Sequence, residues 1–244
     1  MDTSRAAPNF KTVRRKLVIL PIGSCEQHGP YLPVDTDLRI AQLLAEKIAQ
    51  LFSDEETLLL PAIPFSCSWE HKGLGTIALN TGTLSAILHD VAYSLHSWNI
   101  PLFLILLNWH GGNGILSSLT TEITAREGIP TTVIQAISQA GSIWDDNASN
   151  DVHAGAIETS ITQAYWPDLI SSPIPKNAHD IPNVTPASTQ SVLALGIHAV
   201  TQEGIWGSPE LSNPEKGKKL ISTLAGNIHA QIVKLLEVVN TSQL

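Results

Sequence analysis

Short runs of apolar residues alternate along the chain with longer segments in which apolar residues recur every three or four positions. The apolar runs lie at residues 16–23, 57–64, 100–108 and 131–137. Uninterrupted apolar runs of this length are typical of strands that are buried on both faces of a parallel sheet. We therefore expect each run to form one strand of such a sheet.

The segments between these runs have the spacing of helices. In residues 35–52 the apolar side chains recur at helical intervals, and Asp35 or Thr36 is a suitable N-cap. The same spacing predicts further helices at residues 84–97, 113–126 and 213–239. A region rich in proline, serine and asparagine, residues 167–188, predicts a long ordered loop or lid.

Strands that alternate with helices indicate the α/β fold class. We expect a three-layer α/β/α arrangement around a mostly parallel sheet, because the crossover helices of parallel strands cover both faces of the sheet. A length of 244 residues fits one domain of this class, covering residues 1–244. Residues 1–15 are expected to form a flexible N-terminal tail.

The amino-acid composition indicates which classes of partner the protein can be expected to bind. Charged residues make up 15% of the chain, against about 25% in a typical globular protein, so we expect part of the surface to be covered in a homo-oligomer. The formal net charge is −8 and the 14 basic residues are scattered. A nucleic-acid partner is therefore not expected, since such binding depends on neutralising phosphates.

The sequence also gives expectations about location. No apolar run approaches the roughly 20 residues of a membrane span, and the first residues lack the apolar core of a secretory signal. Two cysteines, Cys25 and Cys67, are too few for a disulfide framework or a four-thiolate zinc site. We expect a cytoplasmic protein without a membrane partner.

The segment PIGSCEQHGPYLPVDTDL directly follows the first apolar run and holds Glu26, His28, Asp35 and Asp37. A further histidine, His110, follows the third run in NWHGGN. Active sites of open α/β sheets gather beyond the carboxyl ends of the strands, so these side chains converge if the two strands are neighbours. Carboxylates and imidazoles together suit a divalent cation such as zinc, manganese or iron(II).

Each of these residues also has a simpler structural explanation. Asp35 or Asp37 could cap a helix, and His28 could be a buried turn residue that is hydrogen-bonded to the backbone. Their combination with a histidine at a second strand end favours the metal site. Cys25 offers another alternative, as the nucleophile of a metal-free hydrolase, although buried cysteines are often inert.

Several motifs carry a resemblance to a known family. GSCEQHGPYLPVDTD resembles the signature of the creatininase (creatinine amidohydrolase) family, and NWHGGN is similar to the family's N-G-H-G-G-N. DVHAGAIETS is similar to its H-A-G-x-x-E-T-S, and GIWGSPELSNPEKG to its late G-x-x-G-D-P segment. The resemblance implies a hydrolase with two divalent ions per subunit, zinc first and manganese or iron as alternatives. It also implies a parallel α/β sheet and a hexamer.

The resemblance assigns ligands to the metals. Glu26 and His110 would belong to one ion and His28 to the other, with Asp37 bridging the two. Creatininase itself has a glutamate, which helps to hold the second ion, where this chain has Gly112. The chain is therefore similar to an H-G-G-N subgroup of the family rather than to creatininase proper.

The resemblance also assigns catalytic residues. His153 matches the family's catalytic histidine, which handles protons during amide cleavage. Glu158 matches an acid that either orients this histidine or approaches the metals, and Glu158 or a water could fill the place left by Gly112. The segment WEHKGLGT resembles a family loop, which suggests that His71 lines the site.

We therefore expect a metal-dependent amidohydrolase that cleaves the C–N bond of a cyclic or formyl-type amide, other than an ordinary peptide bond, in a small molecule. Relatives with H-G-G-N include a formamidopyrimidine deformylase and a mycofactocin-precursor peptidase, so an enzyme like either of these is an alternative. Tyr31, Ala156 and Ser208 depart from the family pattern at other positions. Together, Gly112, Ala156 and Ser208 leave open a catalytically impaired member that acts in binding or assembly.

Overall fold

The computed structural model describes Thr3 and residues 16–53, 57–144, 151–171, 173–175 and 189–241. The tail expected at residues 1–15 therefore lies outside the described residues, apart from Thr3. Most of the loop or lid expected at residues 167–188 also lies outside them.

The described part of the chain has a four-stranded parallel sheet with the strand order β2-β1-β3-β4. Its strands are β1 (Lys16–Ile22), β2 (Thr57–Leu59), β3 (Leu102–Asn108) and β4 (Thr131–Gln135). Each falls within one of the apolar runs. β3 is buried along its whole length, which explains why its sequence is continuously apolar instead of alternating.

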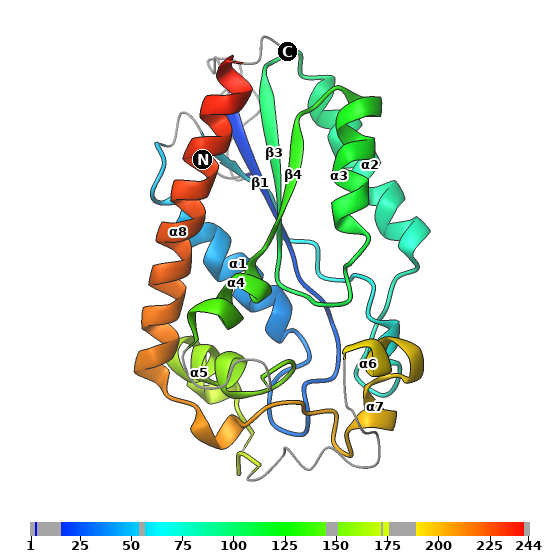
Figure 1. Cartoon of the computed structure of the whole chain (residues 1–244), viewed down its shortest axis with the longest axis vertical. Helices are drawn as coiled ribbons and strands as arrows, with labels where there is room; N and C mark the ends of the chain where they lie inside the picture. The colour runs from blue at the N-terminus through cyan, green and yellow to red at the C-terminus, as the bar shows by residue number, and fades with distance from the viewer. Residues whose placement is uncertain are drawn as a thin grey trace.

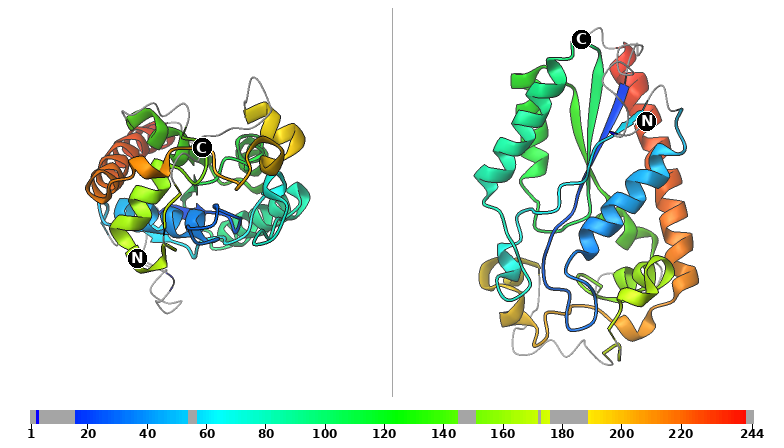
Figure 2. Two further views of the ribbon diagram at one scale, coloured as in Figure 1. Left: turned by 90° about the horizontal axis from the view of Figure 1, so that it is seen from below. Right: turned by 180° about the vertical axis from the view of Figure 1, so that it is seen from behind.

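Helices cover both faces of this sheet (Figure 1). One face is covered by α1 (Thr36–Ala49), α4 (Ala136–Ile143), α5 (Ala156–Tyr165) and α8 (Pro214–Thr241). The other face is covered by α2 (Thr81–His96) and α3 (Leu116–Glu127), as the view from behind in Figure 2 shows. The expected α/β fold with a parallel sheet is confirmed.

The strands divide their side chains between two hydrophobic cores. Leu17, Ile19 and Ile105 pack toward α1 and α8, whereas Val18 and Leu104 pack toward α2 and α3. This alternation follows from the pleat of a strand, which sends successive side chains to opposite faces. Both cores stiffen β1 and β3, the central strands of the sheet.

Several short elements surround the carboxyl ends of the strands. They are α6 (Thr189–Leu195), α7 (Ile197–Val200) and the single 3-10 turns η2 (Trp69–His71), η4 (Pro167–Leu169) and η5 (Pro209–Leu211). In Figure 1, α6 and α7 lie beyond the carboxyl end of the sheet, on the side of α2 and α3. Among the described helices, none combines the length and apolar character that a membrane crossing needs.

Element boundaries differ from the sequence predictions at polar positions. The helix expected from residue 113 begins at Leu116, because Asn113 uses its side chain to link two loops. Its Oδ1 accepts from the backbone N–H of Cys67 at 3.1 Å and its Nδ2 donates to Asn108 Oδ1 at 2.8 Å. The strand expected to reach residue 137 ends at Gln135, where α4 begins directly.

Asp35 does stand at the N-cap position of α1, but its side chain makes no capping hydrogen bond. Its carboxylate instead accepts from Arg39 at 2.8 Å, as a partly exposed pair within α1. The alternative cap, Thr36, is the first residue of the helix, and its hydroxyl donates to the carbonyl of Pro33. The carboxylate of Asp35 therefore pairs with Arg39 at the surface of the protein.

Truncating the centre of β3 should destabilise the whole domain. Leu104 is completely buried, so Leu104→Ala should lower the free energy of unfolding by about 2–5 kcal/mol through lost burial and a cavity. Leu211→Ala is the matched control, because Leu211 is 56% exposed. Urea unfolding followed by circular dichroism measures both; equal midpoints for the two variants would contradict this account of the core.

Candidate metal centre

The candidate ligands are brought together by the level carboxyl ends of β1 and β3. The two strands pair in parallel with Ile22 opposite Asn108, so the loops that follow them leave the sheet side by side. The backbone N–H of Trp109 donates to the carbonyl of Ile22 at 3.0 Å, which continues this pairing beyond the strand ends. Glu26 lies in the first of these loops and His110 in the second.

The loop after β1 returns immediately to α1, whose second residue is Asp37. Gly23 permits this return, since a Cβ there would collide with the backbone of Leu38. Proximity to the start of α1 also favours a carboxylate, because the amino end of a helix carries partial positive charge. The fold thus places Glu26, Asp37 and His110 around one point.

The side chains at this point are buried and close to one another. His110 Nδ1 lies 3.1 Å from Glu26 Oε2 and 3.0 Å from Asp37 Oδ2. On the other side of Asp37, His28 Nε2 lies 3.2 Å from Oδ1. Each oxygen of Asp37 therefore faces a different imidazole, which is the arrangement expected of a carboxylate that bridges two cations.

Backbone carbonyls show which nitrogen of each imidazole carries hydrogen. His28 Nδ1 lies 3.1 Å from the carbonyl of Glu26, and His110 Nε2 lies 2.8 Å from the carbonyl of Cys67. A carbonyl only accepts, so these nitrogens donate, and in the neutral rings the opposite nitrogens are bare lone pairs that point at carboxylates. His28 Nε2 and Glu26 Oε1 are both buried without a hydrogen-bond partner. A divalent cation fits such a donor set.

The electrostatics of the cluster also favour positive charge between the carboxylates. Burial alone would lower the pKa of His28, but the charges of Asp37 and Glu158 raise it well above its ordinary value. Burial opposes protonation of His110 as well, and Glu26 and Asp37 again raise its pKa well above the ordinary value. A cation at the same place would gain from the same field.

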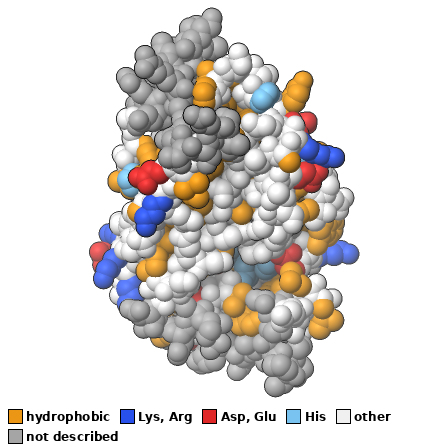
Figure 3. All heavy atoms as spheres, turned by 45° about the horizontal axis from the view of Figure 1, so that its top comes forward, with side chains coloured by type: hydrophobic (Ala, Val, Ile, Leu, Met, Phe, Trp, Pro, Cys, Tyr) orange, Lys and Arg blue, Asp and Glu red, His pale blue; other side chains and the backbone are white. Residues whose placement is uncertain are grey.

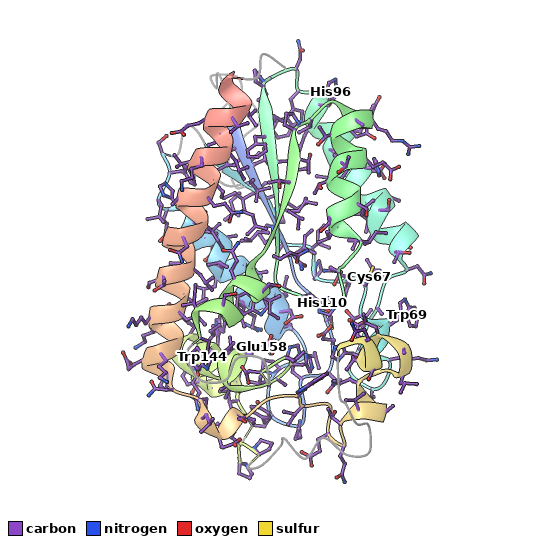
Figure 4. All side chains as sticks on the ribbon, in the orientation of Figure 1. Cys67, Trp69, His96, His110, Trp144 and Glu158 are labelled. Atoms are coloured by element: carbon purple, nitrogen blue, oxygen red, sulfur yellow. The ribbon has the colours of Figure 1, made fainter. Side chains whose placement is uncertain are left out.

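Glu158 reaches this cluster from the first turn of α5. Its Oε2 lies 3.6 Å from His28 Nε2, and its two oxygens accept from Trp109 Nε1 at 3.2 Å and from the backbone N–H of Ala154 at 2.8 Å. Three donor atoms, from His28, His153 and Glu158, lie close enough together to hold an ion. Figure 4 labels Glu158 and His110 near the carboxyl ends of the strands.

Gly112 does not leave a gap. A Cβ at this position would collide with the Glu70 carboxylate, the Cys67 carbonyl oxygen and the ring of His110. The Oε1 of Glu70 lies 3.4 Å from His110 Nε2, so a carboxylate from η2 occupies the space beside Gly112. Glu70 was not predicted as a site residue from the sequence, although it stands directly before His71 in a segment that resembles a family loop.

His153 and His71 form one wall of the site. His153 Nε2 donates to the carbonyl of Gln27 at 2.8 Å, and its Nδ1 lies 3.6 Å from Glu26 Oε1. The ring centres of His153 and His71 are 4.2 Å apart. Burial and neighbouring imidazoles keep the pKa of His153 well below its ordinary value and lower that of His71 to about 2, so both rings are neutral at pH 7.

A strained backbone holds the loop that carries His153. Ala154 has φ 51, a left-handed conformation that non-glycine residues rarely adopt. Its N–H donates to Glu158, and its carbonyl accepts from the hydroxyl of Tyr31. Tyr31, which departs from the family pattern, thus braces this loop and also contacts the Thr159 hydroxyl at 2.7 Å.

At the other two departures from the family pattern, Ala156 and Ser208, the backbone faces the carboxylate of Asp151. Ala156 is the buried first residue of α5, and its N–H donates to Asp151 Oδ1 at 2.6 Å. The N–H of Ser208 lies 3.4 Å from the same oxygen. Asp151 therefore connects the start of α5 with the late motif through the backbone N–H groups of Ala156 and Ser208. These contacts do not use the side chain of either residue.

The cluster lies at the bottom of a cavity of ≈130 Å³. In the view of Figure 3, histidine and acidic side chains lie in a hollow in the lower half of the molecule, with hydrophobic side chains beside them. The cavity is also lined by six apolar side chains: Ile137, Val152, Val192, Leu193, Ile197 and Trp206. The lining thus combines a charged cluster with an apolar wall.

The nucleophile alternative gains no support from the surroundings of Cys25. Burial, followed by the charge of Asp35, raises the pKa of the Cys25 thiol. The reactive thiolate is therefore less available than in a free cysteine. Cys25 is also absent from the described lining of the cavity.

Comparison with known proteins identifies relatives along almost the whole chain. The family model described as "Creatininase: Creatinine amidohydrolase" matches residues 3–232. A mycofactocin precursor peptide peptidase of Mycolicibacterium smegmatis is 28% identical over 214 residues, with 85% of this chain and 81% of the relative covered. The creatinine amidohydrolase of Pseudomonas putida is 22% identical over 245 residues, with 87% and 86% covered.

Solved structures share the fold. A mutant creatininase of the Zn-Zn type superposes with a TM-score of 0.73 at 21% identity, covering 96% of this chain and 97% of that chain. A creatininase with manganese gives a TM-score of 0.69 at 20% identity, with the same coverage. At these identities the likeness concerns the fold.

Replacing a candidate ligand should remove metal without unfolding the protein. Glu26→Gln and His110→Ala should each weaken zinc binding by more than the 10–100-fold typical of residues that only support a ligand. Asp35→Asn, which alters a nearby surface carboxylate, should retain the wild-type zinc content. Metal per chain after dialysis, measured by mass spectrometry alongside circular dichroism, distinguishes these outcomes; unchanged zinc in Glu26→Gln would refute the assignment.

Adding one methyl group at Gly112 should disturb the cluster. Gly112→Ala forces the methyl group against Glu70, Cys67 and His110, and overpacking of this kind costs about 1–3 kcal/mol of folding free energy. Gly111→Ala is the matched control, because a Cβ at Gly111 meets nothing within 4 Å. Urea midpoints and zinc content should fall in the first variant alone. Equal values in both variants would show that Gly112 is not confined.

Proposed function

Because this chain belongs to the creatininase family, a family of hydrolases, we propose that it is a metal-dependent amidohydrolase that uses water to cleave a C–N bond. The observation that carries this proposal is the pair of imidazole nitrogens, His28 Nε2 and His110 Nδ1, that face opposite oxygens of buried Asp37. Without metal ions, protons on these imidazoles must balance the buried carboxylates, whereas divalent cations can displace those protons and bind the same nitrogens and oxygens.

The donor atoms divide into two sets. Glu26 Oε2, Asp37 Oδ2 and His110 Nδ1 would hold one divalent ion, and Asp37 Oδ1, His28 Nε2 and Glu158 Oε2 the other. Zinc is the first expectation for both sites, with manganese or iron as alternatives, since nitrogen and carboxylate donors suit each of these metals. When bound, such ions supply Lewis acidity, which makes water a better nucleophile and polarises an amide carbonyl.

The proton transfers are assigned to His153. Its Nε2 hydrogen is committed to the carbonyl of Gln27, so its bare Nδ1 is available to accept a proton from the attacking water. The leaving nitrogen of the amide is the group that must receive it.

The cavity favours a small or terminal amide. Its ≈130 Å³ is well below the roughly 300–1,000 Å³ of typical ligand pockets, so only a small molecule or the end of a longer one would fit. Its described lining contains four carboxylates and no lysine or arginine. Two divalent ions would balance these charges, which favours a neutral amide with an apolar substituent against the apolar wall.

Two substrate classes meet these requirements. The first is the cyclic or formyl-type amide expected from the sequence. The second is a short peptide, favoured by the 28% identity with a mycofactocin precursor peptide peptidase and by the apolar wall, which could receive a terminal side chain. Both reactions break an amide C–N bond with water, so the same residues would serve either one.

We also infer that the protein forms a homo-oligomer, and a hexamer is the expectation from the family resemblance. Large hydrophobic side chains are exposed on segments that border the cavity: Trp69, Leu74, Ile77, Leu193 and Leu195. Exposed apolar groups concentrated in this way suit a contact between protein surfaces. A cytoplasmic location stays a prediction.

Removing the proposed proton carrier should separate catalysis from metal binding. Zinc- or manganese-loaded protein is tested against creatinine, N-formyl amides, small cyclic amides and short peptides. For any substrate turned over, His153→Gln should lower kcat about 10²–10⁴-fold, the usual contribution of a general acid or base, while the metal content stays at the wild-type value.

Two results would contradict the proposal. Hydrolysis at the full rate by chelator-treated protein would exclude a metal-dependent enzyme. Stable metal binding without turnover of any of these substrates would instead support a family member that acts in binding or assembly. His96→Gln is the control variant, because His96 lies at the opposite end of the sheet in Figure 4.

A further inference from the structure

The side-chain amide of Gln27 is fixed in one orientation by the backbone. The N–H of Gly29 donates to Gln27 Oε1 at 3.0 Å, and Gln27 Nε2 donates to the carbonyl of Gly204 at 3.2 Å. A backbone N–H only donates and a carbonyl only accepts, so exchanging the amide oxygen and nitrogen would break both bonds. The oxygen and nitrogen of this amide are therefore assigned.

The second hydrogen of this amide determines the tautomer of His71. Gln27 Nε2 lies 3.0 Å from His71 Nδ1, so the amide donates and Nδ1 accepts. In a neutral imidazole the hydrogen then resides on the other nitrogen, Nε2. The structure thus directs an N–H group of His71, and not a lone pair, toward the cluster.

His71 differs in this respect from its three neighbours in the site. His28, His110 and His153 each donate to a backbone carbonyl from one nitrogen, so the other nitrogen, which faces the carboxylates, is the one that an ion can bind once it carries no proton. An ion can bind a bare nitrogen, but an N–H repels it. The proximity of His71 to Glu26 and His153, whose donor atoms cluster with its own, therefore does not make it a metal ligand.

The N–H of His71 has room for an acceptor from the substrate. Among the described residues, the acceptor recorded near Nε2 is Glu26 Oε1 at 3.5 Å, which is too long for a good N–H···O bond. His71 lines the cavity, so this N–H adjoins the space that a substrate would enter. An amide offers a carbonyl oxygen, which gains negative charge when water adds to the carbonyl carbon.

We infer that His71 is a catalytic hydrogen-bond donor to the substrate carbonyl oxygen, and that Gln27 is the positioning residue that holds His71 in the donating tautomer. This inference rests on the proposed function for its substrate. A neutral donor aimed at the developing oxyanion stabilises the transition state more than the ground state. Water adds to the carbonyl carbon, its proton passes to His153, and the electron pair of the C=O bond moves to the oxygen that His71 contacts.

The tautomer can be measured without any substrate. In protein labelled with ¹⁵N-histidine and loaded with zinc, long-range proton–nitrogen spectra should show His71 with hydrogen on Nε2. Gln27→Glu should move this hydrogen to Nδ1, because a carboxylate accepts where the amide donated. Gln42→Glu, on the exposed face of α1, should leave the signal unchanged. A zinc-bound or bare Nε2 in the wild-type spectrum would overturn the inference.

Kinetics provide the second measurement. His71→Phe keeps a ring against His153 but lacks the donor, and it should lower kcat about 10²–10³-fold, the effect of removing one oxyanion donor. Its zinc content should equal that of the wild type; loss of zinc would show that His71 is a ligand instead. Full kcat with the expected tautomer would also overturn the donor role. If no amide is hydrolysed at all, the proposed function fails while the tautomer assignment still stands on the spectra.

Discussion

The arrangement of this site follows from one constraint: buried carboxylates and imidazoles share a small volume, and the carboxylates need positive charge beside them. Glu26 and Asp37 are almost completely buried, where an unpaired charge is costly. Glu26 accepts from the hydroxyl of Ser24 at 2.8 Å, and the other close partners of the two carboxylates include His28 and His110, whose outer nitrogens are already committed to backbone carbonyls. A cation held between these groups satisfies the carboxylates and the lone pairs together.

The surrounding fold holds these carboxylates and histidines in place. The parallel pairing of β1 and β3 sets the loops at equal height, and α1 returns directly to bring Asp37 back to them. Backbone carbonyls from three different loop positions hold the outer nitrogens of His28, His110 and His153. Because the backbone makes these contacts, the orientation of each ring depends on the fold more than on adjacent side chains.

The fold and the convergence of Glu26, Asp37 and His110 could be predicted from the sequence because their signals are local. Continuous apolar runs mark β1 and β3, and the polar residues directly after them had to lie at the same edge of the sheet. The elements α4, α6 and α7 were not predicted, since they are short and their boundaries depend on packing around the cavity. Asp35 resembled the ligands in sequence, yet its place on α1 pairs it with Arg39 at the surface.

Glu70 shows why the remaining part of the site could not be predicted. In the sequence, the absence of a side chain at Gly112 suggests that a metal ligand has been lost. In the structure, the carboxylate of Glu70 from another loop occupies the space that a side chain at Gly112 would need. The tautomer of His71 is equally hidden from the sequence. It depends on two backbone groups, at Gly29 and Gly204, that are far apart in the chain and fix a single amide.

The distance along the chain between the ligands has a consequence for folding. Glu26 and Asp37 come from one end of the domain, His110 from its middle and Glu158 from a later helix, so the unfolded chain cannot gather them around one ion. Metal binding therefore selects the folded state, and its free energy adds to the stability of the domain. The ion would join the loops that follow β1 and β3 to the first turns of α1 and α5, and the availability of metal in the surroundings would set how stable the folded chain is.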